Sequence, residues 1–250
     1  MRDAKAPLST LDVQHFVRSM PAAYSATFTA RDTEEHARVV ARRGGELSHV
    51  EVVGGSGSVR TLVCLVAEDR PGLLSIVADA LLAQGLSVRS AHIYCRTRRD
   101  QRLEAVDFFE LAPKGRASEQ QQLDAADVTN FAVTLRQMLA EQLPLEVELA
   151  TVPPSVAERT RVYFDLDALK RGEHVLIVQT SDFAGLLSTV TNALHAQQAR
   201  VSCAEVRTVE GKADDRFELA SDGAESLSAA RLCDIQLAVY TAVVAARARG

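Results

Sequence analysis

Hydrophobic residues along the chain form two kinds of segment, short apolar or alternating runs and longer runs with apolar residues at helical spacing. The first kind predicts strands and the second predicts amphipathic helices. One series predicts strands at 50–53, 60–66, 86–96 and 103–111, and helices at 71–84 and 122–141. A second series predicts strands at 161–164, 175–180, 200–209 and 213–219, and helices at 184–197 and 225–246. The order strand, strand, helix, strand, strand, helix therefore occurs twice.

The two series also share residues, which indicates an internal duplication. Ten of the sixteen positions in 69–84 are identical in 182–197, which lies 113 residues further along the chain. The sequence Asp-Phe-Phe-Glu-Leu at 107–111 returns as Asp-Arg-Phe-Glu-Leu at 215–219. A duplication of this kind decides the architecture, because each copy is expected to form the same unit.

The order of elements predicts the fold of each copy. The second copy ends in a helix, so its opening strand must take the sheet edge that a last strand would otherwise fill. We therefore expect an α+β fold of two ferredoxin-like sandwiches, each a four-stranded antiparallel sheet with two helices on one face. The open face or edge of each sheet could be covered by the other copy. Residues 145–149 alternate and could form an additional strand.

A short helical segment is expected before the repeats. Apolar residues in 11–20 recur at roughly helical spacing up to Pro21, and 33–40 predicts a second helix that glycines close. His36 in this second helix is interpreted as a surface or packing residue. The predicted organisation is a helical N-terminal segment at 1–45, a first domain at 46–150, a proline-rich linker at 151–158 and a second domain at 159–250.

The turn at 69–75, with the sequence Asp-Arg-Pro-Gly-Leu-Leu-Ser, is the main candidate site. Asp69 stands where an N-cap would stand, and Pro71 stands at a first helical position, where its missing N–H costs nothing. Gly72 lets the backbone come close to another group. The next N–H groups lie unpaired at the positive end of the helix. Such a turn is either an ordinary helix start or a seat for a carboxylate.

Composition limits the partners that we expect. A net charge of −5 argues against a general nucleic-acid binder. No apolar run looks long enough to span a membrane, and the N-terminus lacks the apolar region of a secretion signal. The four cysteines stand alone, without a Cys-x-x-Cys pair or a histidine at ligand spacing. These features predict a reduced, cytoplasmic protein without a metal site.

Each repeat resembles the ACT domain, a family of amino-acid-sensing regulatory modules. The resemblance rests on a strand, the sequence Asp-Arg-Pro-Gly-Leu-Leu, an apolar helix, and a hairpin whose second strand contains Asp-x-Phe-x-Leu. It covers residues 46–250. Two such repeats, each opened by an extra strand, resemble the C-terminal ACT tandem of the bacterial PII-uridylyltransferase/uridylyl-removing enzymes.

The resemblance implies that a small amino acid binds between two domains, with its α-carboxylate on backbone N–H groups. Asp69 would accept a hydrogen bond from the α-ammonium or would only cap the helix. In the second repeat Phe183-Ala184 replaces Arg-Pro, so that site is altered or purely structural. The family suggests glutamine, although the sequence itself does not select an amino acid. The implied ligand contacts are Asp69, Arg70, Pro71, Gly72, Leu73 and Leu74 in the first repeat, and Asp182, Phe183, Gly185, Leu186 and Leu187 in the second.

The catalytic motifs of such enzymes are not found in this sequence. A nucleotidyltransferase domain needs a Gly-Ser turn followed by Asp-x-Asp carboxylates for two metal ions. Gly55-Ser56 is instead followed by adjacent Glu68 and Asp69, which point to opposite faces of a strand. No histidine precedes an aspartate, as the phosphohydrolase domain requires, and no P-loop or Gly-x-Ser-x-Gly occurs. We therefore predict no catalytic residue, cofactor or metal.

Three functions stay open at this point. The favoured one is a non-catalytic amino-acid sensor whose readout lies in a homo-oligomer or a regulated enzyme partner. The second is a regulatory remnant or subunit of a PII-uridylyltransferase-type enzyme that acts with separate catalytic domains. The third is a ligand-free pairing module, in which Asp69 and Asp182 only cap helices.

Overall fold

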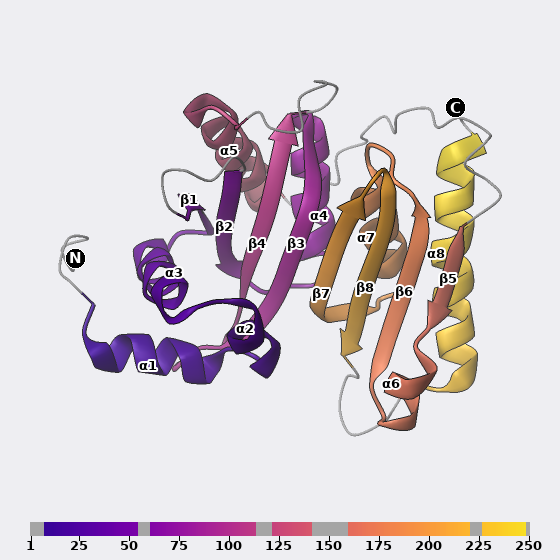
Figure 1. The fold of residues 1–250 in the computed structure, drawn as a ribbon, viewed down its shortest axis with the longest axis horizontal. Helices are drawn as coiled ribbons and strands as arrows, with labels where there is room; N and C mark the ends of the chain where they lie inside the picture. Colours follow the sequence, from indigo (N-terminus) through magenta and orange to yellow (C-terminus); the bar gives the residue numbers. More distant parts are fainter. Residues whose placement is uncertain (1–7, 55–60, 114–121, 142–159, 221–226, 249–250) are drawn as a thin grey trace.

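The computed structural model describes residues 8–54, 61–113, 122–141, 160–220 and 227–248. Within these ranges the chain folds as one α+β unit, shown in Figure 1. The N-terminal segment contains α1 (Thr10–Ser19), α2 (Ala22–Thr27) and α3 (Ala30–Arg43). The first repeat contains β1 (Ser48–Val53), β2 (Thr61–Glu68), α4 (Leu73–Ala83), β3 (Leu86–Thr97), β4 (Leu103–Pro113) and α5 (Ala125–Glu141). The second repeat contains β5 (Arg161–Phe164), α6 (Leu166–Lys170), β6 (His174–Ser181), α7 (Leu186–Ala196), β7 (Arg200–Val209), β8 (Lys212–Ala220) and α8 (Ala229–Ala248).

The predicted order of strands and helices is confirmed in both repeats, with two short helices missed. Helices α2 and α6 are not among the predicted elements, and α3 begins three residues before its predicted start. Both missed helices are only about one turn and a half long, so their apolar residues show no helical period. Asp165 starts α6 by accepting hydrogen bonds from two backbone N–H groups of that helix.

The eight strands form one antiparallel sheet in the order β1-β2-β4-β3-β7-β8-β6-β5. The expectation of two separate four-stranded sheets is therefore wrong, because β3 of the first repeat pairs with β7 of the second. The opening strands β1 and β5 lie at the two outer edges, as the order of elements predicted. The inner edges that each repeat would otherwise expose are joined to each other, which removes two open strand edges.

The junction between β3 and β7 has an approximate twofold symmetry. Ala91 pairs with Val206, and Ile93 pairs with Ala204. Ala204 and Val206 occupy the positions in the second repeat that Ala91 and Ile93 occupy in the first. The register of this pairing is therefore the same when the two repeats are exchanged.

The helices α4 and α7 cross-link the repeats with the same symmetry. Ser188 donates to Asp79 Oδ1 at 2.5 Å, and Ser75 donates to Asn192 Oδ1. Asn192 Nδ2 also donates to Asp79 Oδ1 at 3.0 Å. Asp79 is only 4% exposed, so these donors satisfy a carboxyl group that burial would otherwise penalise. Burial raises the pKa of Asp79 above its usual value.

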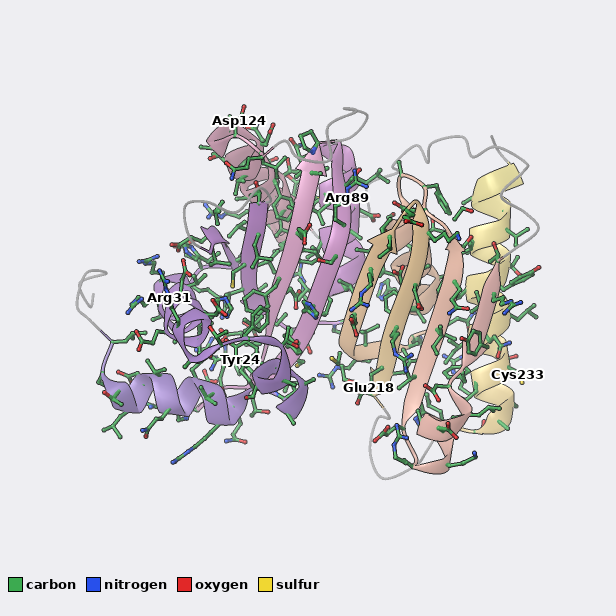
Figure 2. All side chains as sticks on the ribbon, in the orientation of Figure 1. Tyr24, Arg31, Arg89, Asp124, Glu218 and Cys233 are labelled. Atoms are coloured by element: carbon green, nitrogen blue, oxygen red, sulfur yellow. The ribbon has the colours of Figure 1, made fainter. Side chains whose placement is uncertain are left out.

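The two faces of the sheet are covered differently. Helices α4, α5, α7 and α8 pack on one face and enclose the main apolar core (Figure 1). The N-terminal helices α1, α2 and α3 cover the other face over the first repeat only. No described helix covers that face over β5–β8. Figure 2 shows the contrast, since Glu218 on this face is exposed, whereas Tyr24 lies among the N-terminal helices.

The sequences of β4 and β8 reflect the different cover of the two repeats by helices. In β8, buried and exposed residues alternate along the strand, while β4 is buried on both faces. Val106 and Phe108 of β4 correspond to Asp214 and Arg216 of β8 in the repeat alignment. A strand with one solvated face carries polar residues there, and a strand covered on both faces does not.

The N-terminal segment is held by an aromatic cluster and a buried ion cluster. Tyr24 is fully buried and bonds His36 Nδ1 at 2.8 Å, so the interpretation of His36 as a packing residue is confirmed. Arg43 and Arg96 both contact Glu104, at 2.7 and 2.5 Å, and all three are less than 10% exposed.

Some predictions fall outside the described residues. These are the linker at 151–158 and the additional strand at 145–149. Contrary to the expectation from sequence, α8 is long and apolar enough to cross a membrane by length and composition, with a mean hydropathy of 1.4 over Ala229–Ala246. In the structure Ile235, Val239 and Val243 of α8 are fully buried in the main core. Only 22% of this window is buried, and Leu237 and Tyr240 on α8 are exposed.

Replacing Glu104 by alanine should destabilise the protein by about 3–5 kcal/mol, because it leaves two buried guanidinium groups without their partner. Urea unfolding measures this difference. Glu173→Ala is the matched control, since it removes an exposed ion pair with Arg171, and it should cost less than about 1 kcal/mol. Equal, small effects of the two substitutions would contradict a structural role for the buried cluster.

Acidification should weaken the N-terminal segment through His36. Burial lowers the pKa of His36 to about 4, whereas the unfolded chain takes up this proton near 6.5. The contribution is complete above pH 6.5 and is lost as the pH falls towards 4, by about 3 kcal/mol in total. Unfolding measured at several pH values should show a shallower profile for His36→Phe than for the wild type. Parallel profiles would contradict this prediction.

Candidate functional site

A cavity at the junction of the repeats lies beside the predicted turn of the first repeat. It has a volume of about 540 Å³, and we call it the inter-repeat cavity. The first repeat contributes its turn and parts of β3 and β4, and the second contributes the end of α7 and the start of β7. Its lining residues include Asp69, Gly72, Leu74, Asp107, His195 and Arg200.

The turn itself differs from the sequence prediction in two respects. Helix α4 begins at Leu73 with Gly72 as its N-cap in the left-handed conformation, φ +77°. Pro71 is therefore not in the first helical position, and Asp69 does not cap the helix. The left-handed conformation explains why glycine is needed there. Gly72 also approaches the second repeat closely, because a Cβ at this position would lie 2.8 Å from Cε1 of His195.

Not all of the N–H groups predicted for carboxylate binding are available. Leu73 N–H donates to the carbonyl oxygen of Arg70 at 3.1 Å. Gly72 and Leu74 N–H have no hydrogen-bond partner in the described part of the chain. They lie at the positive end of α4, which favours an anion.

Asp69 instead forms a bridge between the repeats. Its Oδ2 lies 2.9 Å from Nη2 of Arg200 and accepts from Cys95 Sγ at 3.2 Å. Burial and the neighbouring Asp69 carboxylate raise the pKa of Cys95 to about 12, so the thiol stays protonated. The cavity wall thus presents one carboxylate and one guanidinium side by side, from different repeats.

Arg70 forms a hydrogen bond that joins the turn to helix α5. Its Nη2 donates to the carbonyl oxygen of Leu139 at 2.8 Å, near the C-terminal end of α5. A guanidinium at this position satisfies a carbonyl group that the helix end leaves unpaired. Arg70 lines the cavity but is already engaged, so its predicted ligand contact is secondary.

The corresponding turn of the second repeat has little free space beside it. Gly185 has the same left-handed conformation, φ +93°, and Leu186 N–H donates to the carbonyl oxygen of Phe183. Phe183 packs against the main core, and the cavity beside it measures only about 60 Å³. Asp182, Leu186 and Leu187 line this small cavity. The predicted alteration of the second site therefore corresponds to a loss of volume.

Sequence reasoning missed the residues that complete the inter-repeat cavity. Arg200 and His195 correspond to Ser87 and Leu82 of the first repeat, so the duplication gave no signal for them. Asp107 was visible, because Asp107 and Asp215 begin the repeated Asp-x-Phe-x-Leu sequence. Among the described residues, no group of three histidine, cysteine or acidic side chains is placed to hold a metal ion.

Comparisons with known proteins identify relatives of this chain. It is similar to part of bifunctional uridylyltransferase/uridylyl-removing enzymes. The protein of that name from Rhodospirillum rubrum is 31% identical over 232 residues, which cover 88% of this chain and 24% of the relative. The proteins of that name from Azospirillum brasilense and Xanthomonas campestris are 29% and 27% identical, and they match 84% and 64% of this chain.

The chain therefore spans about a quarter or less of the length of these relatives. No family model matches it. The resemblance to uridylyltransferases that the sequence suggested is confirmed for a partial region of those enzymes. The assignment of each repeat to the ACT family stays a prediction.

The contact between Gly72 and His195 can be tested with two glycines in the same conformation. Gly72 and Gly172 have φ values of +77° and +79°, but only Gly72 faces a neighbour within 4 Å. Both alanine variants pay about 1–2 kcal/mol for the left-handed backbone. We expect Gly72→Ala to be less stable than Gly172→Ala in urea unfolding, and His195→Ala to remove the excess. Equal stability of both variants would mean that the close approach is absent.

Proposed function

We propose that this chain is a non-catalytic regulatory region that binds one small amino acid in the inter-repeat cavity. The observation that carries the proposal is the pair of opposite charges at the cavity wall, Asp69 from one repeat and Arg200 from the other, 2.9 Å apart. An α-amino acid carries the complementary pair, an ammonium and a carboxylate, on one carbon atom.

The geometry supports a specific arrangement of the ligand. Its α-carboxylate would lie against Arg200 and the N–H groups of Gly72 and Leu74. Its α-ammonium would take the place of Arg200 beside Asp69. Charge-assisted hydrogen bonds of this kind are about twice as strong as neutral ones. The sequence resemblance favours glutamine as the ligand.

Binding between the repeats provides a means of regulation. A ligand that contacts both repeats favours the joined arrangement only by its difference in affinity for the joined and separated states. The matched relatives are several times longer than this chain and are named as uridylyltransferases. We propose that a regulated enzyme partner, or further domains of such an enzyme, receives the signal.

A ligand-free pairing module is the competing function, and the same ion pair supports it. Asp69 and Arg200 already satisfy each other and could serve only to hold the repeats together. Asp69 contributes no helix cap, so this alternative rests on the contacts that join the repeats, namely the ion pair, the β3–β7 pairing and the α4–α7 hydrogen bonds.

Calorimetric titration with the twenty amino acids separates these functions. We expect binding of at least one amino acid with a stoichiometry of one per chain, because the second turn is closed by Phe183. Arg200→Ala should weaken binding by about tenfold or more, since a hydrogen bond to a charged group contributes about 1.5–3 kcal/mol. Arg207→Ala is the control, because it removes an exposed ion pair with Glu205.

Flat titrations for all twenty amino acids, on protein shown to be folded, would contradict the sensor and favour the pairing module. Two ligands per chain would contradict the closure of the second site. Recovery of a nucleotidyltransferase in a pull-down with the full chain would support a regulated enzyme partner.

A further inference from the structure

A groove lies at the outer edge of the second repeat, between strand β5 and helix α8. It has a volume of about 520 Å³, and we call it the edge groove. Figure 1 shows β5 and α8 at the end of the sheet that is remote from the first repeat. The lining is mainly apolar and includes Val162, Tyr163, Cys233, Leu237 and Tyr240. The proposed amino-acid site uses none of these residues.

Helix α8 exposes apolar side chains beside this groove. Leu237 is 65% exposed and Tyr240 is 43% exposed. The equivalent helix of the first repeat differs at this point. When the core residues Phe131 of α5 and Ile235 of α8 are aligned, the exposed Arg136 takes the place of Tyr240. A solvated helix face is normally polar, so the apolar face of α8 indicates a contact surface.

Strand β5 also has unpaired backbone groups along this edge. It pairs with β6 on one side, and no described strand lies on its other side. The N–H group of Asp165 donates to the carbonyl oxygen of Val175 in β6 at 2.9 Å. Because successive residues of a strand alternate in direction, the N–H and C=O groups of Val162 and Phe164 point outwards. An exposed edge of this kind can pair with a strand of another chain.

We propose that a second copy of this chain covers the edge groove, by antiparallel pairing of β5 with β5 about a twofold axis. The junction of the repeats is built in the same way, since β3 pairs antiparallel with β7 and α4 is bonded to α7. The sheet would continue across the axis, and the apolar faces of the two α8 helices would lie side by side on one face of it. This inference does not depend on amino-acid binding.

The residues of β5 are self-complementary in one register. Exposed and buried residues alternate along the strand, so buried positions must pair with buried positions. With Tyr163 on the axis, Val162 pairs with Phe164 of the second copy, and Arg161 lies opposite Asp165 of the second copy. Arg161 has no ion-pair partner among the described residues of its own chain. The register centred on Val162 would instead place Arg161 opposite Tyr163, so charge complementarity favours the first register.

Sedimentation equilibrium of the full chain over a range of concentrations tests the proposal. We expect the wild type to dimerise reversibly. Leu237→Arg should raise the dissociation constant by about tenfold or more, because a charge buried without a partner is costly. Val133→Arg is the matched control and should leave the dissociation constant unchanged, since Val133 is 49% exposed at the equivalent position of α5.

A wild type that stays monomeric up to about 1 mM would overturn the proposal. Equal weakening of the dimer by Leu237→Arg and Val133→Arg would also overturn it, because the edge groove would then have no special part in the contact.

Cysteine cross-linking tests the register, in a chain whose exposed Cys233 is replaced by serine. Tyr163→Cys places two thiols at a non-hydrogen-bonded pair on the axis, with Cα atoms about 4.5 Å apart, which a disulfide can span. Oxidation by diamide should therefore link the two copies covalently. Arg161→Cys is the matched control on the same face of β5, because its two Cα atoms would lie about 13 Å apart along the paired strands. Cross-linking at both positions or at neither, in folded protein, would overturn the proposed pairing.

Discussion

The pairing of β3 with β7 is the constraint on which the rest of the structure depends. It joins two duplicated units into one sheet and fixes their register by an approximate twofold symmetry. The same symmetry brings α4 against α7, where Asp79 and Asn192 exchange hydrogen bonds with serines of the opposite repeat. It also places the turn of one repeat against the end of a helix of the other. A cavity between the repeats follows from this geometry and would not exist in either unit alone.

The backbone arrangement of the two repeats is approximately symmetric, but the side chains at corresponding positions differ. The first turn faces His195 and Arg200, whereas the second faces their counterparts Leu82 and Ser87, which carry no ionisable group. Phe183 stands where the first repeat has Arg70 and fills the second cavity instead of reaching a helix end. The first site thus has an open cavity with a carboxylate and a guanidinium at its wall, whereas side chains fill most of the second site.

The N-terminal segment is a second asymmetry between the repeats, because it covers the face of β3 and β4 that lies opposite the cavity. Along β4, Ala105 and Asp107 line the cavity, while Glu104 and Phe108 face the N-terminal helices. Adjacent residues of a strand point to opposite faces, so the same two strands carry both contacts. A shift of β3 or β4 would therefore alter both the cavity and the contacts with the N-terminal helices.

Most of the fold could be predicted from the sequence, because the duplication and the strand and helix periods agreed with each other. The single sheet could not, since nothing in Ala91 or Val206 shows which edge they pair with. The turn at 69–74 was located correctly, and its role was only partly understood. The position of Asp69 before a helix suggests either a helix cap or a ligand contact, yet its partner Arg200 lies 131 residues away. Contacts between repeats leave no local pattern, and the cavity consists mainly of such contacts.

Hydrogen exchange at the junction of the repeats tests the central claim most directly. In residues 90–94 of β3 and 203–207 of β7, the N–H groups directed away from β4 and β8 should be bonded across the junction. The joined sheet predicts that these groups exchange as slowly as those of the central strands β2 and β8. Exchange as fast as that of the outward N–H groups of β1, at the edge of the sheet, would show that the repeats are not joined and that the cavity between them does not form.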